Sequence, residues 1–173
     1  MKEEISTTVL ILIIVLSFSY ASADEYVKAP TDLQAKLFSK VFLFNNNLTK
    51  GGDIVVHVIH STEFAAELRK SIGQKIGKSK ISVVTESEGL PGEKPSVIYL
   101  GEPEKLEEVI KYSQSEKILS ITGIPELVLK GITLGIGVKK KKPEILMNIS
   151  SSQSEGMDWN PIILKVCKII KGP

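Results

Sequence analysis

Apolar positions in this chain follow two spacings that take turns along the sequence. In residues 31–42, Leu33, Leu37 and Val41 recur every four positions, which is the spacing of one face of a helix. Residues 53–59 instead read D-I-V-V-H-V-I, a nearly continuous apolar run that is typical of a strand buried on both faces. The change of spacing predicts a helix that is followed by a buried strand.

The same alternation continues through the next sixty residues. The asparagines at 45–47 should end the first helix, and Ser61 or Thr62 can cap a second one. Further segments follow the two patterns in turn: a helix with Phe64, Leu68 and Ile72, strands Lys80–Thr85 and Ser96–Leu100, a helix opened by Pro103, and a short strand Ile118–Thr122. Strands that alternate with helices predict βαβ units and a mainly parallel sheet.

The end of the chain departs from this alternation. The apolar runs Ile132–Val138 and Glu144–Ile149 are joined only by K-K-K-K-P, which is too short for a crossover and predicts an antiparallel hairpin. A polar loop then leads to Asn160 and Pro161, where I-I-L-K-V-C-K-I-I predicts a closing amphipathic helix. The whole pattern predicts an α/β three-layer sandwich, with a mostly parallel central sheet, helices on both faces and a C-terminal antiparallel hairpin.

The first 23 residues have the features of an export signal. A short start with Lys2 precedes the apolar run Val9–Phe18, and Ala21-Ser22-Ala23 supplies a small-residue cleavage site before Asp24. Cleavage between Ala23 and Asp24 would leave one domain spanning residues 24–173. The alternative is an uncleaved membrane anchor, since the uncharged run of 17 residues from position 7 meets the lower limit of roughly 17–25 for a spanning helix.

Charge and cysteine content narrow the function further. Removal of residues 1–23 takes away Lys2, Glu3 and Glu4, which changes the net charge from +2 to +3. This small positive charge does not indicate a nucleic-acid partner. Cys167 is the only cysteine, so no disulfide can form within one chain, and its apolar neighbours favour a buried thiol.

Two motifs that suggest chemistry have simpler interpretations. Gly73 and Gly77 precede Lys78, but a phosphate loop needs its glycines five positions apart, after a strand and before a helix. His57 and His60 are the only histidines, and a zinc site needs three or four convergent ligands. We therefore expect no metal and no cofactor. His60, at the carboxyl end of a strand, is the histidine more suited to face solvent or a ligand.

Charged side chains form two notable groups. Glu104, Glu107 and Glu108 alternate with lysines on a predicted helix, which indicates a solvated face rather than acid–base catalysis. No nucleophile-elbow motif accompanies them, so we expect no enzyme activity. The lysines of the turn at 139–142 could contact anionic lipids or an acidic partner, or they could simply form a hairpin tip that discourages edge-to-edge pairing.

Several of these segments together resemble the YfiR-like family of exported bacterial proteins. The similarity runs from about Leu33 to Ile170 and rests on A-K-L-F-S-K-V-F-L-F-N-N-N-L, I-L-S-I-T-G, K-G-I-T-L-G-I-G-V, the strand that carries Asn148, and I-I-L-K-V-C-K-I-I. The first helix ends in N-N-N-L where many members have Trp-Pro. The cysteines that form disulfides in the best-known branch are absent.

The resemblance implies a periplasmic α/β sandwich without enzyme activity. It also implies regulation of a membrane-bound signalling protein, a diguanylate cyclase or a sensor kinase, through that protein's exterior domain, and hence a role in cyclic-di-GMP signalling. The sequence also allows a homodimer, and a purely structural protein of the cell envelope is a further alternative. The rival interpretation is a small-molecule-binding accessory protein of an envelope transport system, with its ligand at the sheet edge near His60, Thr85 and Gly101.

Five residues are the candidates for binding a partner or a ligand. They are His60 after its strand, Thr122 at the end of a strand, Gly131 in a turn before the hairpin, Asn148 at the end of the hairpin, and Trp159 at the entry to the last helix. Trp159 is the only tryptophan, and it suits either a staple of the helix start to the core or an anchor for a partner.

Overall fold

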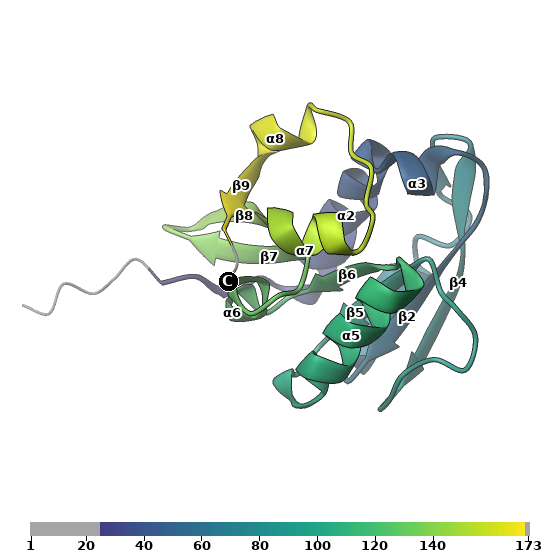
Figure 1. Cartoon of the computed structure of the whole chain (residues 1–173), viewed down its shortest axis with the longest axis horizontal. Helices are drawn as coiled ribbons and strands as arrows, with labels where there is room; N and C mark the ends of the chain where they lie inside the picture. The colour runs from purple at the N-terminus through teal and green to yellow at the C-terminus, as the bar shows by residue number, and fades with distance from the viewer. Residues whose placement is uncertain (1–24, 172–173) are drawn as a thin grey trace, which may run out of the picture.

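One mixed sheet forms the centre of the molecule. The structure is a computed structural model that describes residues 25–171. Its nine strands run in the order β3-β4-β2-β5-β6-β7-β8-β9, and β1 pairs with the far end of β7 (Figure 1). The strands are β1 (Val27–Lys28), β2 (Gly52–Ile59), β3 (Lys75–Ile76), β4 (Ser79–Ser87), β5 (Val97–Leu100), β6 (Leu119–Thr122), β7 (Leu134–Lys139), β8 (Lys142–Asn148) and β9 (Cys167–Ile170).

The predicted mainly parallel sheet with an antiparallel hairpin is confirmed. Strands β4, β2, β5, β6 and β7 run parallel to one another, and β7 and β8 pair antiparallel from Leu134↔Met147 to Lys139↔Lys142. The hairpin turn at Lys140 and Lys141 has φ values of 50° and 63°. Two consecutive left-handed residues match a primed turn, whose twist suits a two-residue hairpin.

Helices cover both faces of this sheet, as the alternating pattern predicted. They are α2 (Thr31–Val41), α3 (Asn46–Thr49), α4 (Thr62–Arg69), α5 (Leu106–Glu116), α6 (Pro125–Leu129), α7 (Ile149–Ser154) and α8 (Ile163–Val166), with 3-10 turns at Phe42–Phe44 and Pro103–Lys105. Figure 1 shows α5 and α7 on the near side of the sheet and α2 behind it. The helices therefore form the outer two of three layers.

Alternating side chains of the strands build a separate core under each helical layer. On β5, Val97 and Tyr99 pack with Phe38 of α2 and Phe64 of α4, while Ile98 points to the opposite face. That opposite core also contains Val109 of α5 and Leu127 of α6. A strand buried on both faces has to be apolar at every position, which explains the continuous run V-I-Y-L.

Three aromatic and amide side chains fix the first core. The Phe64 and Tyr99 rings stack with their centroids 3.7 Å apart. The Tyr99 hydroxyl donates to Gln34 Oε1 at 2.8 Å, and Gln34 Nε2 donates to the Ala29 carbonyl at 2.6 Å. Gly123 lies against this amide, since a Cβ built there would fall 2.1 Å from Gln34 Oε1. The buried polar chain thus ties the segment before α2 to the centre of the sheet.

The two ends of the described chain meet beside the hairpin. The Tyr26 hydroxyl, just before β1, donates to Glu144 Oε2 on β8 at 2.5 Å. The ammonium groups of Lys139 and Lys168 lie 5.4 and 5.3 Å from the centre of the Tyr26 ring. Such distances allow cation–π attraction, so β1 and β9 are both held at this place.

The closing helix predicted from I-I-L-K-V-C-K-I-I is wrong over most of its length. Only Ile163–Val166 is helical, and Cys167–Ile170 forms β9, which pairs parallel with β8. The long connection from β8 through α7 and α8 supplies the crossover that a parallel pair requires. The prediction that Cys167 is buried is confirmed, but the thiol lies on a strand and packs with the first core.

Three smaller predictions also need correction. The asparagines at 45–47 do not simply end a helix, because the Asn45 side chain accepts from Leu48 N and caps the new short helix α3. Ser61 precedes α4, but its side chain accepts no capping hydrogen bond from the helix backbone. The predicted strand Lys80–Thr85 is longer than expected, at Ser79–Ser87, and the short β3 pairs with its start.

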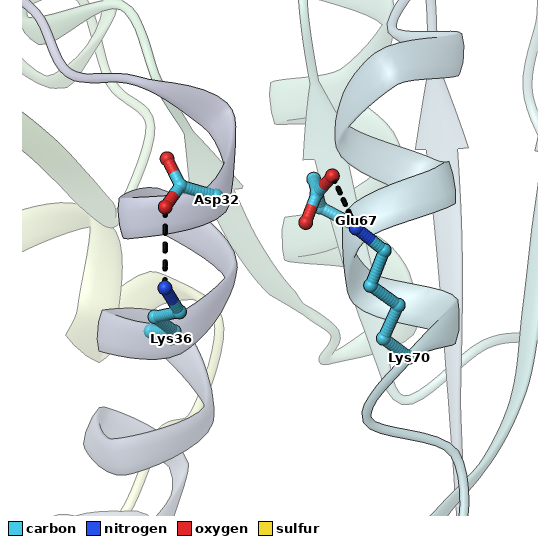
Figure 2. Close-up of polar contacts among 4 residues, drawn as sticks. All are labelled: Asp32, Lys36, Glu67 and Lys70. Atoms are coloured by element: carbon cyan, nitrogen blue, oxygen red, sulfur yellow. Dashed lines mark hydrogen bonds and ion pairs between the residues drawn. The ribbon is translucent and has the colours of Figure 1, made fainter.

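The outer faces of α2 and α4 carry ion pairs along the helix surface. Lys36 Nζ lies 3.2 Å from Asp32 Oδ2, and Lys70 Nζ lies 2.6 Å from Glu67 Oε1 (Figure 2). Exposed pairs of this kind contribute little to stability, because water and salt screen the two charges. They are features of a solvated surface.

Candidate functional site

An open cavity lies at the carboxyl ends of β2 and β4, where open parallel sheets commonly bind ligands. It measures about 420 Å³ and is lined by His60, Ser61, Thr62, Glu86, Ser87, Glu88 and Glu102. His60 adopts a left-handed φ of 51°, which is unusual for a residue other than glycine. The turn therefore places His60 at the cavity wall, in agreement with its predicted place at the end of a strand.

Gly101 supports the His60 turn from the next strand. A Cβ at Gly101 would lie 2.3 Å from the His60 carbonyl oxygen, and Gly101 N donates to the Ile59 carbonyl at 2.8 Å. Only glycine permits this close approach of two backbones. The structure thus brings His60 and Gly101 together, as the ligand-binding interpretation expected, whereas Thr85 contacts the other histidine.

The cavity is acidic. Three of its lining residues are glutamates, and Glu86 also lies 2.7 Å from the Arg69 guanidinium. A hydrogen bond from Thr62 and the bond from Arg69 lower the pKa of the Glu86 carboxyl. Glu88 and Glu102 are exposed, so the cavity suits a ligand that is cationic or rich in hydrogen-bond donors. Within residues 25–171, no group of three His, Cys, Asp or Glu side chains could hold a metal ion.

His57 is a buried structural histidine. Its Nε2 lies 3.0 Å from the Gly89 carbonyl oxygen, and its Nδ1 lies 2.8 Å from Thr85 Oγ1. A carbonyl can only accept, so Nε2 carries the proton and, in the neutral ring, Nδ1 accepts from the threonine hydroxyl. These bonds fasten the loop after β4 to the sheet.

Three of the predicted binding residues surround α6. Thr122 Oγ1 donates to the Leu100 carbonyl at 2.7 Å and accepts from Ile124 N at 3.1 Å. Asn148 Nδ2 donates to the Val128 carbonyl at 2.9 Å, and its Oδ1 caps α7. Gly131 has a φ of 123° and lies against Ile110. Thr122 and Asn148 are buried, so their observed contacts hold α6 and α7 in place.

Trp159 lies apart from the His60 cavity, on the segment between α7 and α8. Its Nε1 donates to Ser152 Oγ at 2.7 Å, its backbone bridges to Asn45, and its half-buried ring packs against the first core. These contacts support the core staple, and the partly exposed ring leaves the role of a partner anchor as a proposal. Ala23 and Asp24, the predicted cleavage site, lie outside the described residues.

The sequence interpretation missed Glu155, which is fully buried after α7. Its carboxyl accepts hydrogen bonds from Ser113, Ser120 and Thr133. Burial raises the pKa of this carboxyl to about 7, although the hydrogen bonds oppose the rise. The surrounding sequence S-S-S-Q-S-E-G has the composition of an exposed loop, so no pattern in it marks a buried acid.

A family match follows the sequence resemblance. Residues 34–168 match the family described as YfiR/HmsC-like. The chain belongs to this family. Its members regulate diguanylate cyclases in the periplasm. In residues 25–171 of the present member, no helix has the length and apolar content needed to cross a membrane. A search of curated proteins found no significant match.

Solved structures support the fold alone. A "conserved domain protein" of Vibrio cholerae O1 biovar El Tor superposes with a TM-score of 0.56 at 13% identity over 83% of this chain. A protein from Streptococcus pneumonia, described as the ABC domain in complex with L-Trp, gives a TM-score of 0.53 at 14% identity over 82% of this chain. The YfiR/HmsC-like chain spans 60% and 62% of those two chains.

Proposed function

We propose that this protein is a non-enzymatic regulator in the periplasm that modulates a membrane-bound signalling protein by contact with its exterior domain. The signalling protein would be a diguanylate cyclase or a sensor kinase. The observation that carries the proposal is the family match over residues 34–168, which covers nearly all of the described fold. We also propose that the five candidate binding residues serve this contact, and that an export signal is cleaved between Ala23 and Asp24.

An apolar surface near the C-terminal end supports contact with another protein. Ile162, Leu164, Val166 and Ile169 expose 49%, 53%, 46% and 38% of their surface. These are four of the ten large hydrophobic side chains that are exposed in residues 25–171, and they fall within eight positions of α8 and β9. Exposed apolar side chains that gather in one region of a protein can mark a protein contact. We call these four residues the α8–β9 surface.

Recovery of a membrane partner tests this function. A tagged full-length chain is expressed in its own host, crosslinked in intact cells and purified from the envelope fraction. We expect a membrane protein with a cyclase or kinase domain to be recovered, and deletion of the regulator to change the level of cyclic-di-GMP or kinase output. Recovery of no such protein, together with unchanged signalling on deletion, would refute the proposal.

A pair of surface variants locates the contact. Leu164→Asp places a charge on the α8–β9 surface, and Ile72→Asp places one at a residue with a similar exposure of 49% after α4. We expect only Leu164→Asp to reduce partner recovery, because a charge disfavours an apolar interface. The oligomeric state of both variants is measured by light scattering, which separates loss of a partner from loss of a homodimer.

A second candidate function is supported by the acidic His60 cavity. Its volume of about 420 Å³ lies in the usual range of roughly 300–1,000 Å³ for small-molecule sites. In this alternative the protein binds a small amine-bearing solute for an envelope transport system. A thermal-shift screen of polyamines and basic amino acids tests it, since a ligand of the folded state raises the melting temperature. The shift should disappear in Glu102→Gln and persist in Glu104→Gln.

A further inference from the structure

Glu155 joins four separate parts of the fold through one carboxyl group. Its Oε1 accepts from Ser113 Oγ of α5 at 3.0 Å and from Ser120 Oγ of β6. Its Oε2 accepts from Ser120 N at 3.0 Å and from Thr133 Oγ1, just before β7, at 2.6 Å. The backbone of Glu155 continues α7, since its N–H donates to the Ser151 carbonyl at 2.8 Å. The side chain thus fastens the end of α7 to the second core.

The hydrogen bonds can satisfy both protonation states of the acid. An ionised carboxylate only accepts, and it receives a donor at each of the four bonds described. A neutral acid must donate one proton, and Oε2 faces the backbone N–H of Ser120, which cannot reverse. The proton therefore sits on Oε1, and Ser113 or Ser120 must turn its hydroxyl to accept. Ser113 has an alternative acceptor in the Ile110 carbonyl, at 3.1 Å.

The charged groups around Glu155 do not pair with it. On α5 and its cap, the Lys117 ammonium donates to the Ser154 carbonyl at 2.8 Å, and Glu116 lies 3.8 Å from Lys94. From β6 and from residue 133, the groups that bond to the carboxyl are hydroxyls and one amide. Within residues 25–171, none of its hydrogen bonds comes from a cation. Ionisation thus places in the core a charge that is stabilised by hydrogen bonds but paired with no cation in them, which makes it costly to bury.

The segment that follows Glu155 depends on its position. Met157 N donates to the Ser152 carbonyl at 3.0 Å, and Asp158 N donates to Asn47 Oδ1 at 2.7 Å. Trp159 then bonds to Ser152, and the chain continues into α8 and β9. Displacement of Glu155 toward water would therefore weaken the contacts of Met157, Asp158 and Trp159.

We propose that Glu155 is a proton-operated latch for the segment from α7 to α8. The neutral acid stays in its hydroxyl cluster and holds this segment against the sheet. The ionised acid favours a looser arrangement in which the carboxylate gains water and residues 155–163 release their contacts. The α8–β9 surface is carried by the segment, so its presentation would follow the pH outside the cytoplasm. The latch does not depend on which partner, if any, uses that surface.

The single tryptophan reports on this latch directly. Trp159 is bonded to α7 and lies four residues after Glu155, so its fluorescence should change when the segment loosens. We expect a sigmoidal change between pH 5 and pH 9 with a midpoint near 7 in the full folded chain. Over the same range, amide hydrogen exchange in residues 149–163, corrected for its intrinsic pH dependence, should accelerate relative to β2.

Two variants decide between the latch and other causes. Glu155→Gln keeps a neutral group that can donate from the Oε1 position, and it should remain in the low-pH state throughout. His60→Asn removes the half-buried histidine at the end of β2, far from the Glu155 cluster along the chain, and it should leave the transition unchanged. A transition that persists in Glu155→Gln, or that disappears in His60→Asn, would overturn the proposal.

A third variant tests the proposal even if Glu155→Gln does not fold. Thr133→Val removes one donor to Oε2 and keeps the side-chain shape. The bond from Thr133 stabilises the ionised carboxyl, so its loss should move the midpoint upward by about one to two pH units. A midpoint that stays in place in Thr133→Val would show that the carboxyl does not control the segment.

Discussion

The buried chain from Tyr99 through Gln34 to Ala29 allows one stability prediction to be developed in detail. Tyr99→Phe removes only the hydroxyl, because stacking on Phe64 at 3.7 Å holds the ring in place. Gln34 is fully buried, and its Oε1 would lose the donor that lies 2.8 Å away. An unsatisfied buried acceptor costs about 1–3 kcal/mol, so we expect the free energy of unfolding to fall by that amount.

Urea unfolding followed by tryptophan fluorescence measures this change. We expect the midpoint to decrease while the dependence on urea stays the same, because the surface exposed on unfolding does not change. Tyr112→Phe is the control, since Tyr112 on α5 is partly exposed and its variant should differ by less than about 0.5 kcal/mol. Measurements are made at one pH, which keeps Glu155 in one state.

A double-mutant cycle shows whether the hydroxyl acts through Gln34. Gln34→Met removes the acceptor and also the donor to the Ala29 carbonyl, so it should destabilise the protein by itself. In that background the Tyr99 hydroxyl has lost its bond to Gln34, and Tyr99→Phe should cost less than it does in the parent chain. An equal cost of Tyr99→Phe in both backgrounds would refute the reasoning.

Three further predictions follow from single sites. Burial raises the pKa of the Cys167 thiol to about 12, so a thiol reagent at pH 8 should react only after urea is added, and rapid reaction of the native protein would contradict the buried β9. Lys141→Gly relieves a left-handed residue with a φ of 63° and should raise the free energy of unfolding by about 1 kcal/mol in urea titrations, whereas destabilisation would contradict the primed turn. The folded-state pKa of Glu155 is raised from 4.5 to about 7, so the folded state binds more protons and the free energy of unfolding should fall by about 3 kcal/mol as pH rises through that window. Glu155→Gln should abolish this loss, and stability that rises with pH across the window in the parent chain would show the sign to be wrong.

The parts of the fold that the sequence predicts are those set by local patterns. The four-residue spacing of Leu33, Leu37 and Val41 is a property of one helix, and it correctly predicts α2. The lysine turn allows only an antiparallel hairpin, because no parallel connection can be so short. Such predictions need no knowledge of distant neighbours.

The last segment shows where this reasoning fails. I-I-L-K-V-C-K-I-I is short and mostly apolar, and a run of that kind does not distinguish a helix from a strand by periodicity. Its β-branched residues fit a strand, but β9 forms only because a connection through α7 and α8 returns the chain beside β8. The pairing of β9 with β8 depends on the tertiary structure, so local propensity could not reveal it.

The candidate site residues show the same difference between what a local pattern predicts and what only the fold reveals. The place of His60 follows from the end of an apolar run, which the sequence displays directly. Glu155 becomes notable only through Ser113, Ser120 and Thr133, which lie 22 to 42 positions away along the chain. Its neighbours in sequence are polar, so composition predicts exposure where the fold enforces burial.

The meeting of the two chain ends at Tyr26 has a consequence for engineering. Tyr26 and Ile170 line one apolar cavity of about 230 Å³, and Figure 1 shows the C-terminal end of the ribbon beside the first strand. A short linker could therefore join the ends, while new ends could be opened at the exposed residues Gly92–Lys94. Because the ends of the described chain lie close together, a circularly permuted chain should retain the same sheet.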